Sequence, residues 1–140
     1  MNFEELGLCK EIISSINEKG YKNPTEIQRS AIPHILTGRD LLGCAQTGTG
    51  KTGSFIMPLA EILSSGKSKS RMPRSLILAP TRELAMQVAD EFNFINKFLK
   101  LQMALLIGGV SFTEQDTKLA KGVDVLVATP GRLIDHIERG

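Results

Sequence analysis

The sequence lacks the features typical of secreted, metal-binding and membrane proteins. Only two of its 140 residues are cysteines, and Cys9 and Cys44 lie far apart without metal-ligand spacing, so both are expected to be reduced thiols. The amino terminus has neither a basic start nor an apolar run, which argues against a signal peptide. No stretch approaches transmembrane length. These absences predict a cytoplasmic protein with no membrane segment.

The composition is that of a folded domain. Hydrophobic residues make up 41% of the chain and charged residues 23%, which is typical of a globular protein rather than a disordered one. Lys and Arg number 17 against 15 Asp and Glu, a net charge of +2. This balance does not by itself indicate a nucleic-acid partner, because such proteins usually show a clustered basic surface. Evidence for such a partner must come from the placement of residues.

The strongest local signal is the segment AQTGTGKT at residues 45–52. It follows the phosphate-binding loop pattern with Ala45 in place of the first glycine. Gly48 and Gly50 allow backbone amides to point inward, and the following helix adds the positive end of its dipole. Lys51 is predicted to reach the β- and γ-phosphates and Thr52 to ligate Mg²⁺, as the two catalytic residues. The alternative is a glycine-rich turn that opens a helix. The predicted nucleotide site comprises Ala45, Gln46, Thr47, Gly48, Thr49, Gly50, Lys51 and Thr52.

Strand and helix patterns alternate along the chain. Nearly continuous apolar runs predict buried strands at 40–45, 75–79, 101–107 and 123–128. Helical patterns lie between and after them at 51–64, 81–100, 111–121 and 131–139. This order predicts an α/β fold with a parallel sheet, in which functional residues gather at the carboxyl ends of the strands.

Two further helices are predicted before the first strand. An apolar stripe that includes Ile12 and Ile16 indicates the first, and Gly20 is its expected stop. The second is expected to begin at Asn23 as the N-cap, with Pro24 in its first position and Glu26 completing a capping box.

Three clusters follow the later strands, at the same predicted edge of the sheet. They are PTRELA at 80–85, Gly108-Gly109, and TPGR at 129–132. Helix amino termini, glycine amides, threonine hydroxyls and two arginines suit a run of phosphodiesters. Each cluster taken alone has a simpler explanation: the threonines cap helices, the glycines form a turn, and the arginines pair with carboxylates. Together they favour a polyanion track.

These motifs resemble, in order, those of the DEAD-box RNA helicases. The segment GYKNPTEIQ at residues 20–28, with Phe3 upstream, looks like the Q motif, and 45–52 resembles the family's Walker A sequence. The three strand-end clusters resemble motifs Ia, GG and Ib. The resemblance implies a RecA-like P-loop NTPase fold with helices on both faces of the sheet. Residues 1–38 would form a Q-motif helical region and 39–140 a partial ATP-binding domain.

The resemblance also implies roles for individual residues. Gln28 would contact the adenine edge and select ATP over GTP, Phe3 would stack on the base, and Tyr21 would be a neighbouring apolar contact; the alternative for Gln28 is an exposed helix residue. RNA would bind through its backbone, independently of sequence and sensitively to salt. No role is assigned to His34 or His136. The implied RNA contacts are Pro80, Thr81, Arg82, Gly108, Gly109, Thr129, Pro130, Gly131 and Arg132.

Several motifs of the family are missing. The sequence contains no DEAD or SAT motif and no second RecA-like domain, and its one Asp-Glu pair, Asp90-Glu91, lies in a predicted helix. We therefore expect an amino-terminal portion of a helicase core that binds ATP or ADP and RNA but hydrolyses nothing. An incomplete sheet would also expose an open edge and favour self-association. A different P-loop enzyme, such as a kinase or GTPase, and a non-catalytic nucleic-acid-binding module with a vestigial nucleotide site are the alternatives.

Overall fold

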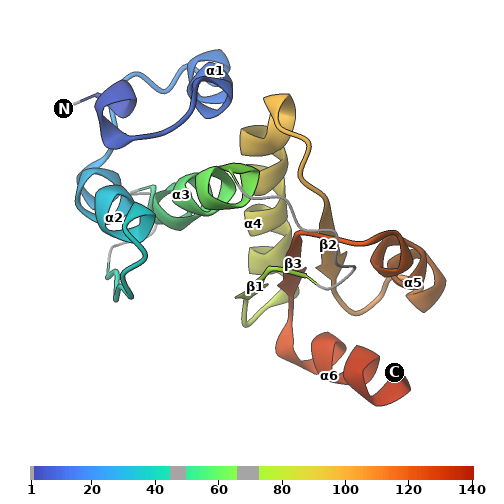
Figure 1. Cartoon of the computed structure of the whole chain (residues 1–140). Helices are drawn as coiled ribbons and strands as arrows, with labels where there is room; N and C mark the ends of the chain where they lie inside the picture. Colours follow the sequence, from blue (N-terminus) through green and yellow to red (C-terminus); the bar gives the residue numbers. More distant parts are fainter. Residues whose placement is uncertain (1, 45–49, 66–72) are drawn as a thin grey trace. The chain divides into compact units, whose positions relative to one another are not determined.

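The computed structural model describes residues 2–44, 50–65 and 73–140 (Figure 1). The chain divides into two compact units. One comprises Met1–Lys67 with Glu91–Lys100, and the other comprises Ser68–Asp90 with Leu101–Gly140. The predicted boundary after residue 38 does not coincide with this division and stays a prediction. Among the described residues, no helix is long and apolar enough to cross a membrane.

The first unit is helical. It contains the 3-10 helix η1 (Phe3–Leu6), α1 (Lys10–Glu18), α2 (Glu26–Leu36), α3 (Lys51–Ser65), the end of α4 (Arg82–Ile95) and the 3-10 helix η2 (Asn96–Phe98). Its core consists of side chains that are completely buried, among them Ile12, Ile16, Ile32, Ile56 and Met57. In α1, Ile12 and Ile16 are four residues apart, and in α3 the buried Ile56, Ala60 and Leu63 follow helical spacing, so these helices pack with one face inward.

The end of α1 and the start of α2 are fixed by capping hydrogen bonds. Gly20, at φ +82°, ends α1 as predicted: its N–H donates to the carbonyl of Asn17, and the N–H of Tyr21 donates to Ile16. The predicted start of α2 at Asn23 was wrong. Thr25 is the N-cap, and Gln28 rather than Glu26 completes the capping box.

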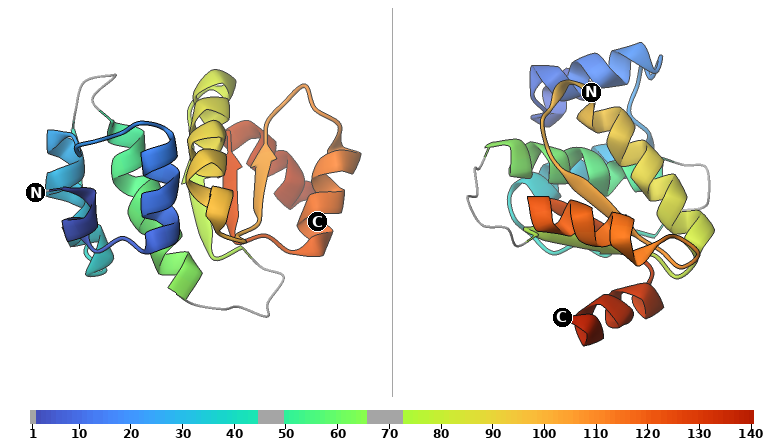
Figure 2. Two further views of the ribbon diagram at one scale, coloured as in Figure 1. Left: turned by 90° about the horizontal axis from the view of Figure 1, so that it is seen from above. Right: turned by 90° about the vertical axis from the view of Figure 1, so that its right-hand side faces the viewer.

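The second unit is built on a parallel sheet. The order of its described strands is β1 (Ser75–Leu78), β3 (Val125–Ala128) and β2 (Met103–Leu106), all parallel. The helices α5 (Phe112–Lys121) and α6 (Pro130–Arg139) each follow a strand, and two views in Figure 2 show them beside the sheet. Leu119 of α5 and Leu133 of α6 pack against a core of Ala104, Leu106, Val123 and Ala128. The predicted parallel α/β fold is confirmed, with strands at three of the four predicted places.

The fourth predicted strand, at 40–45, was wrong. Residues 40–44 are irregular and exposed, and Leu42 is 90% exposed; residue 45 lies outside the described part of the chain. An apolar run becomes a strand only where a neighbouring strand accepts and donates its ladder hydrogen bonds. The described strands all belong to the other unit, and residues 40–44 form no strand.

Candidate functional site

Gln28 connects α2 to Gly50 of the predicted phosphate-binding segment. Its side-chain Nε2 donates to the carbonyl of Gly50 at 3.1 Å, and its Oε1 accepts from the backbone N–H of Thr25 at 3.0 Å. Gln28 is 5% exposed, so the alternative of an exposed helix residue was wrong. A primary amide has two donor hydrogens and two acceptor lone pairs, and these bonds use one of each.

Gly50 is the residue of the phosphate-binding segment on which this contact depends. Its φ is +80°, and a Cβ there would lie 2.6 Å from Gln28 Nε2 and 3.0 Å from the Thr25 side chain. Only glycine combines this conformation with such a close approach. The preceding predicted site residues, Ala45, Gln46, Thr47, Gly48 and Thr49, lie outside the described residues.

Lys51 and Thr52 are the first two residues of α3. A helix amino terminus favours anions because its first N–H groups are unpaired and its dipole is positive there. Lys51 is exposed and Thr52 half-buried. Lys51 also lines a pocket of about 420 Å³. The residues lining this pocket are Ile35, Arg39, Asp40, Leu41, Gly43, Lys51, Ser54 and Phe55.

The described residues contain no cluster of three or more His, Cys, Asp or Glu side chains that would hold a metal by itself. Binding of Mg²⁺ stays a prediction. Mg²⁺ keeps several waters and is commonly held by one or two protein oxygens together with substrate phosphates. Thr52 would supply one such oxygen.

The two aromatic residues expected near the base differ in their surroundings. Phe3, in η1, is 3% exposed and belongs to the core. Tyr21 is 38% exposed and meets Phe94 edge to face, with ring centroids 6.0 Å apart. Burial and the nearby carboxylate of Glu91 raise the pKa of Tyr21. The stacking of Phe3 on a base and the apolar contact from Tyr21 stay predictions.

In the second unit, the three strand-end clusters share one edge because their strands are parallel. Two of the clusters touch: a Cβ at Gly109, whose φ is +80°, would lie 2.5 Å from Nη1 of Arg82. The Thr81 hydroxyl accepts from the N–H of Leu84 at 3.2 Å, so Thr81 caps α4. Thr129, the N-cap of α6, makes no such side-chain bond. The exposed members of these clusters are Pro80, Thr81, Arg82, Gly108, Gly109, Pro130 and Gly131.

Arg132 is half-buried, and its hydrogen bonds go to neutral groups. The simpler explanation for this arginine, in which it pairs with a carboxylate, predicted a charged partner instead. Its Nε donates to Oε1 of Gln115 at 3.1 Å, and Nη2 donates to the carbonyl of Val110. The guanidinium also lies over the Phe112 ring, 3.5 Å from its centroid. Such cation–π contacts add to the hydrogen bonds in fixing the plane of the group.

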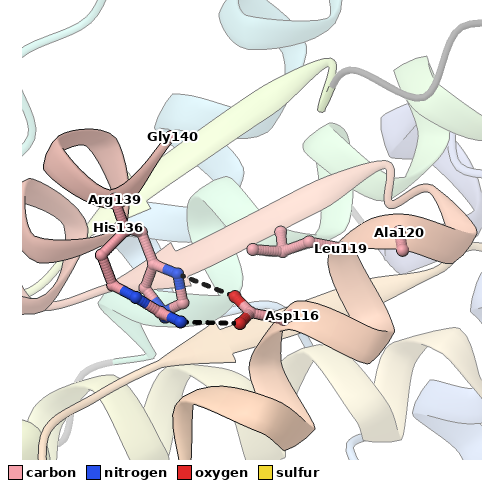
Figure 3. Close-up of a pocket in the computed structure, with 6 residues that line it drawn as sticks. All are labelled: Asp116, Leu119, Ala120, His136, Arg139 and Gly140. Atoms are coloured by element: carbon pink, nitrogen blue, oxygen red, sulfur yellow. Dashed lines mark hydrogen bonds and ion pairs between the residues drawn. The ribbon is translucent and has the colours of Figure 1, made fainter.

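Sequence reasoning missed the residues beside Arg132. His136 packs edge to face on Phe112, and its Nδ1 lies 3.6 Å from Oδ1 of Asp116, which also pairs with Arg139 at 3.1 Å (Figure 3). Burial lowers the pKa of His136, Asp116 opposes this, and Arg132 and Arg139 add to it. Positions 132, 136 and 139 recur at helical spacing, which is the signal that indicates a shared face. A pocket of about 430 Å³ beside them is lined by Asp116, Leu119, Ala120, His136, Arg139 and Gly140.

The fold and these motifs define a P-loop helicase domain, and comparison with known proteins agrees. The model of the DEAD/DEAH box helicase family matches residues 25–140. The chain belongs to this family.

Individual relatives resemble almost the whole chain. The ATP-dependent RNA helicase DeaD of Buchnera aphidicola subsp. Baizongia pistaciae (strain Bp) is 45% identical over 99% of this chain, which covers 23% of that protein. The crystal structure of the RNA helicase Prp28 from Chaetomium thermophilum bound to ADP matches with a TM-score of 0.91 and 45% identity. The match covers 99% of this chain and 34% of the Prp28 chain. The crystal structure of a DEAD box protein from the hyperthermophile Methanococcus jannaschii matches with a TM-score of 0.89 and 41% identity. The match covers 100% of this chain and 38% of that protein's chain. The chain spans less than two fifths of each of these proteins.

Proposed function

We propose that this chain is the ATP- and RNA-backbone-binding portion of an ATP-dependent RNA helicase that unwinds duplexes at the expense of ATP. The observation that carries the proposal is the bond from Gln28 to Gly50, which joins the predicted adenine-reading residue to the predicted phosphate-binding loop. The similar Prp28 structure has ADP bound, which supports a nucleotide at the corresponding place.

The chain would contact both the base and the phosphates of the nucleotide. The remaining donor and acceptor of the Gln28 amide match N7 and the amino group of adenine, whereas guanine offers O6 in place of that amino group. Lys51 would neutralise the β- and γ-phosphates, and Thr52 would hold Mg²⁺ among them. Phe3 and Tyr21 would supply the apolar surroundings of the base.

RNA would follow the edge where β1, β2 and β3 end. The proximity of Arg82 to Gly109, and the rigid placement of Arg132, support a run of phosphate contacts there. Contacts of this kind carry no base identity, so binding would be independent of sequence and would weaken with salt.

Hydrolysis is not expected of this chain. Its single Asp-Glu pair, Asp90-Glu91, lies within α4 rather than after a strand, and the sequence has no DEAD motif. Phosphoryl transfer depends on groups that position the metal and the attacking water, so their absence removes nearly all turnover.

A calorimetric titration with ADP and with GDP in Mg²⁺ tests the nucleotide site. We expect ADP to bind and GDP not to bind, and Gln28→Ala to weaken ADP binding by about tenfold, as for a lost hydrogen-bonding partner in a buried site. Gln87→Ala, at an exposed position of α4, is the matched control and should bind ADP like the wild type.

Equal affinity for ADP and GDP would contradict the role of Gln28. RNA binding without any nucleotide binding would favour the non-catalytic module instead. Phosphate release from ATP above a protein-free blank, lost on Lys51→Ala, would contradict the proposed lack of hydrolysis.

A further inference from the structure

Gln115 of α5 is a buried polar side chain with both ends of its amide engaged. It is 4% exposed. Its Nε2 donates to the carbonyl of Ile107 at 3.0 Å, while Oε1 accepts from Nε of Arg132 at 3.1 Å. Nε2 of His136 lies within hydrogen-bond distance of the same oxygen. One neutral amide therefore joins the end of β2, the body of α5 and the face of α6.

This connection spans two of the predicted RNA-binding clusters. Ile107 directly precedes Gly108-Gly109, and Arg132 lies in the first turn of α6, which follows β3. β2 and β3 are neighbours, with Leu106 in register with Ala128. The Gln115 amide thus fixes the position of the Arg132 side chain relative to the glycine turn at the end of the adjacent strand.

The orientation of Arg132 depends on this amide. Of the five N–H donors of a guanidinium, the bonds to Gln115 and Val110 use two, and the Phe112 ring supports its face. The other donors are then held in a fixed direction before any ligand arrives. Holding a side chain in its binding rotamer in advance lowers the entropy lost on binding.

We propose that Gln115 is a positioning residue that acts through Arg132 and presents its guanidinium, together with the Gly108-Gly109 turn, to a nucleic-acid backbone. This inference rests on the proposed binding of RNA along the strand ends. Gln115 itself carries no charge and is buried, so its effect on binding would be indirect. If the amide only fastened α5 to β2, the losses of RNA affinity caused by changing Gln115 and Arg132 would be independent of each other and would add.

The test is a double-mutant cycle on RNA affinity, measured with single-stranded oligouridylate by fluorescence anisotropy at several salt concentrations. Gln115→Met keeps the size of the side chain but removes its donor and acceptor. We expect it to weaken binding about fivefold to tenfold and to lower the slope of log K against log salt by about 0.7, the share of one phosphate contact. In an Arg132→Met background, the same exchange should have no further effect. Gln102→Met, at an exposed position before β2, is the matched control and should leave both quantities unchanged.

The outcomes separate the two proposals. If the wild-type chain does not bind the RNA, the proposed function fails and this inference falls with it. If the wild type binds and Gln115→Met binds equally well, or if the two losses add, only the positioning role is overturned.

A second measurement covers the case in which Gln115→Met does not fold. In the wild-type chain, Nε–H of Arg132 should exchange with solvent far more slowly in NMR spectra than Nε–H of the exposed Arg39. Equal exchange at the two groups would overturn the proposal, because Gln115 would then not hold the guanidinium.

Discussion

Two buried glutamines make equivalent connections, one in each unit. Gln28 joins the start of α2 to Gly50, and Gln115 joins the end of β2 to Arg132. An amide suits this task because it supplies a donor and an acceptor without a charge, and a buried charge would carry a large desolvation penalty. In both cases a residue outside the groups proposed to contact phosphates helps to set their geometry.

His136 is predicted to make stability depend on pH. Its pKa is lowered in the folded chain, chiefly by burial, so the unfolded chain binds the proton more tightly. The neutral ring therefore contributes stability that is complete above the ordinary pKa of 6.5 and is lost as the pH falls through the lower folded value. We expect the free energy of unfolding, measured in urea, to decrease as the pH falls through this range. In His136→Gln the decrease should be smaller.

The exposed His34, at the end of α2, provides the matched control for this prediction. The pH dependence of His136→Gln is compared with that of His34→Gln, which makes the same exchange at an exposed position. Asp116, Asp135, Arg132 and Arg139 all act on the His136 ring, and they remain in the variant. An unchanged pH dependence in His136→Gln would therefore show that the ring does not titrate differently on folding.

The roles of individual residues could be predicted only where a short stretch of sequence forms a recognisable motif. The phosphate-binding segment was predicted from a short local pattern. The role of Gln28, which stays a prediction, came only from the resemblance of residues 20–28 to the Q motif, since its partner Gly50 lies 22 residues away. Gln115 was missed because its partners lie 8, 17 and 21 residues away and meet it only when the sheet forms. Its helix, FTEQDTKLAK, has the composition of an exposed surface helix.

At the scale of elements, the cap of α2 leads to a stability prediction. The Thr25 hydroxyl accepts from the N–H of Gln28, and the Gln28 amide accepts in return from the N–H of Thr25. Thr25→Ala should lower the free energy of unfolding by about 1 kcal/mol, as is usual when a capping hydroxyl is removed. Thr25→Ser, which keeps the hydroxyl, should recover most of this loss in urea titrations. Equal stability of the Ala and Ser variants would show that the hydroxyl contributes nothing.

Helices were predicted from the spacing of their apolar residues, and strands from nearly continuous apolar runs that indicate burial on both faces. The strands at 75–79, 101–107 and 123–128 formed because each finds a parallel neighbour in the sheet. The segment 40–45 shows the limit of this reasoning. Its apolar residues resemble those of a strand, but pairing depends on a partner that the segment's own sequence cannot reveal.

At the scale of the whole chain, the described sheet leaves apolar surface unpaired. β1 has a neighbour on one side only, since the strand order is β1-β3-β2. Leu76 and Leu78 are two residues apart in β1, so their side chains lie on the same face of the sheet, where they are 48% and 53% exposed. An edge strand with exposed apolar side chains is a template for pairing with another chain.

We propose that this edge makes the chain self-associate. The molar mass from light scattering should rise with protein concentration, and Leu78→Lys should reduce the rise because a charge on an edge strand opposes pairing. Ile62→Lys, which changes a 43% exposed position of α3 outside the sheet, is the matched control and should associate like the wild type. A monomer mass at every concentration would contradict the proposal. An equal reduction by both variants would attribute the association to general hydrophobicity, since the added charge is the same and only the place of the lysine differs.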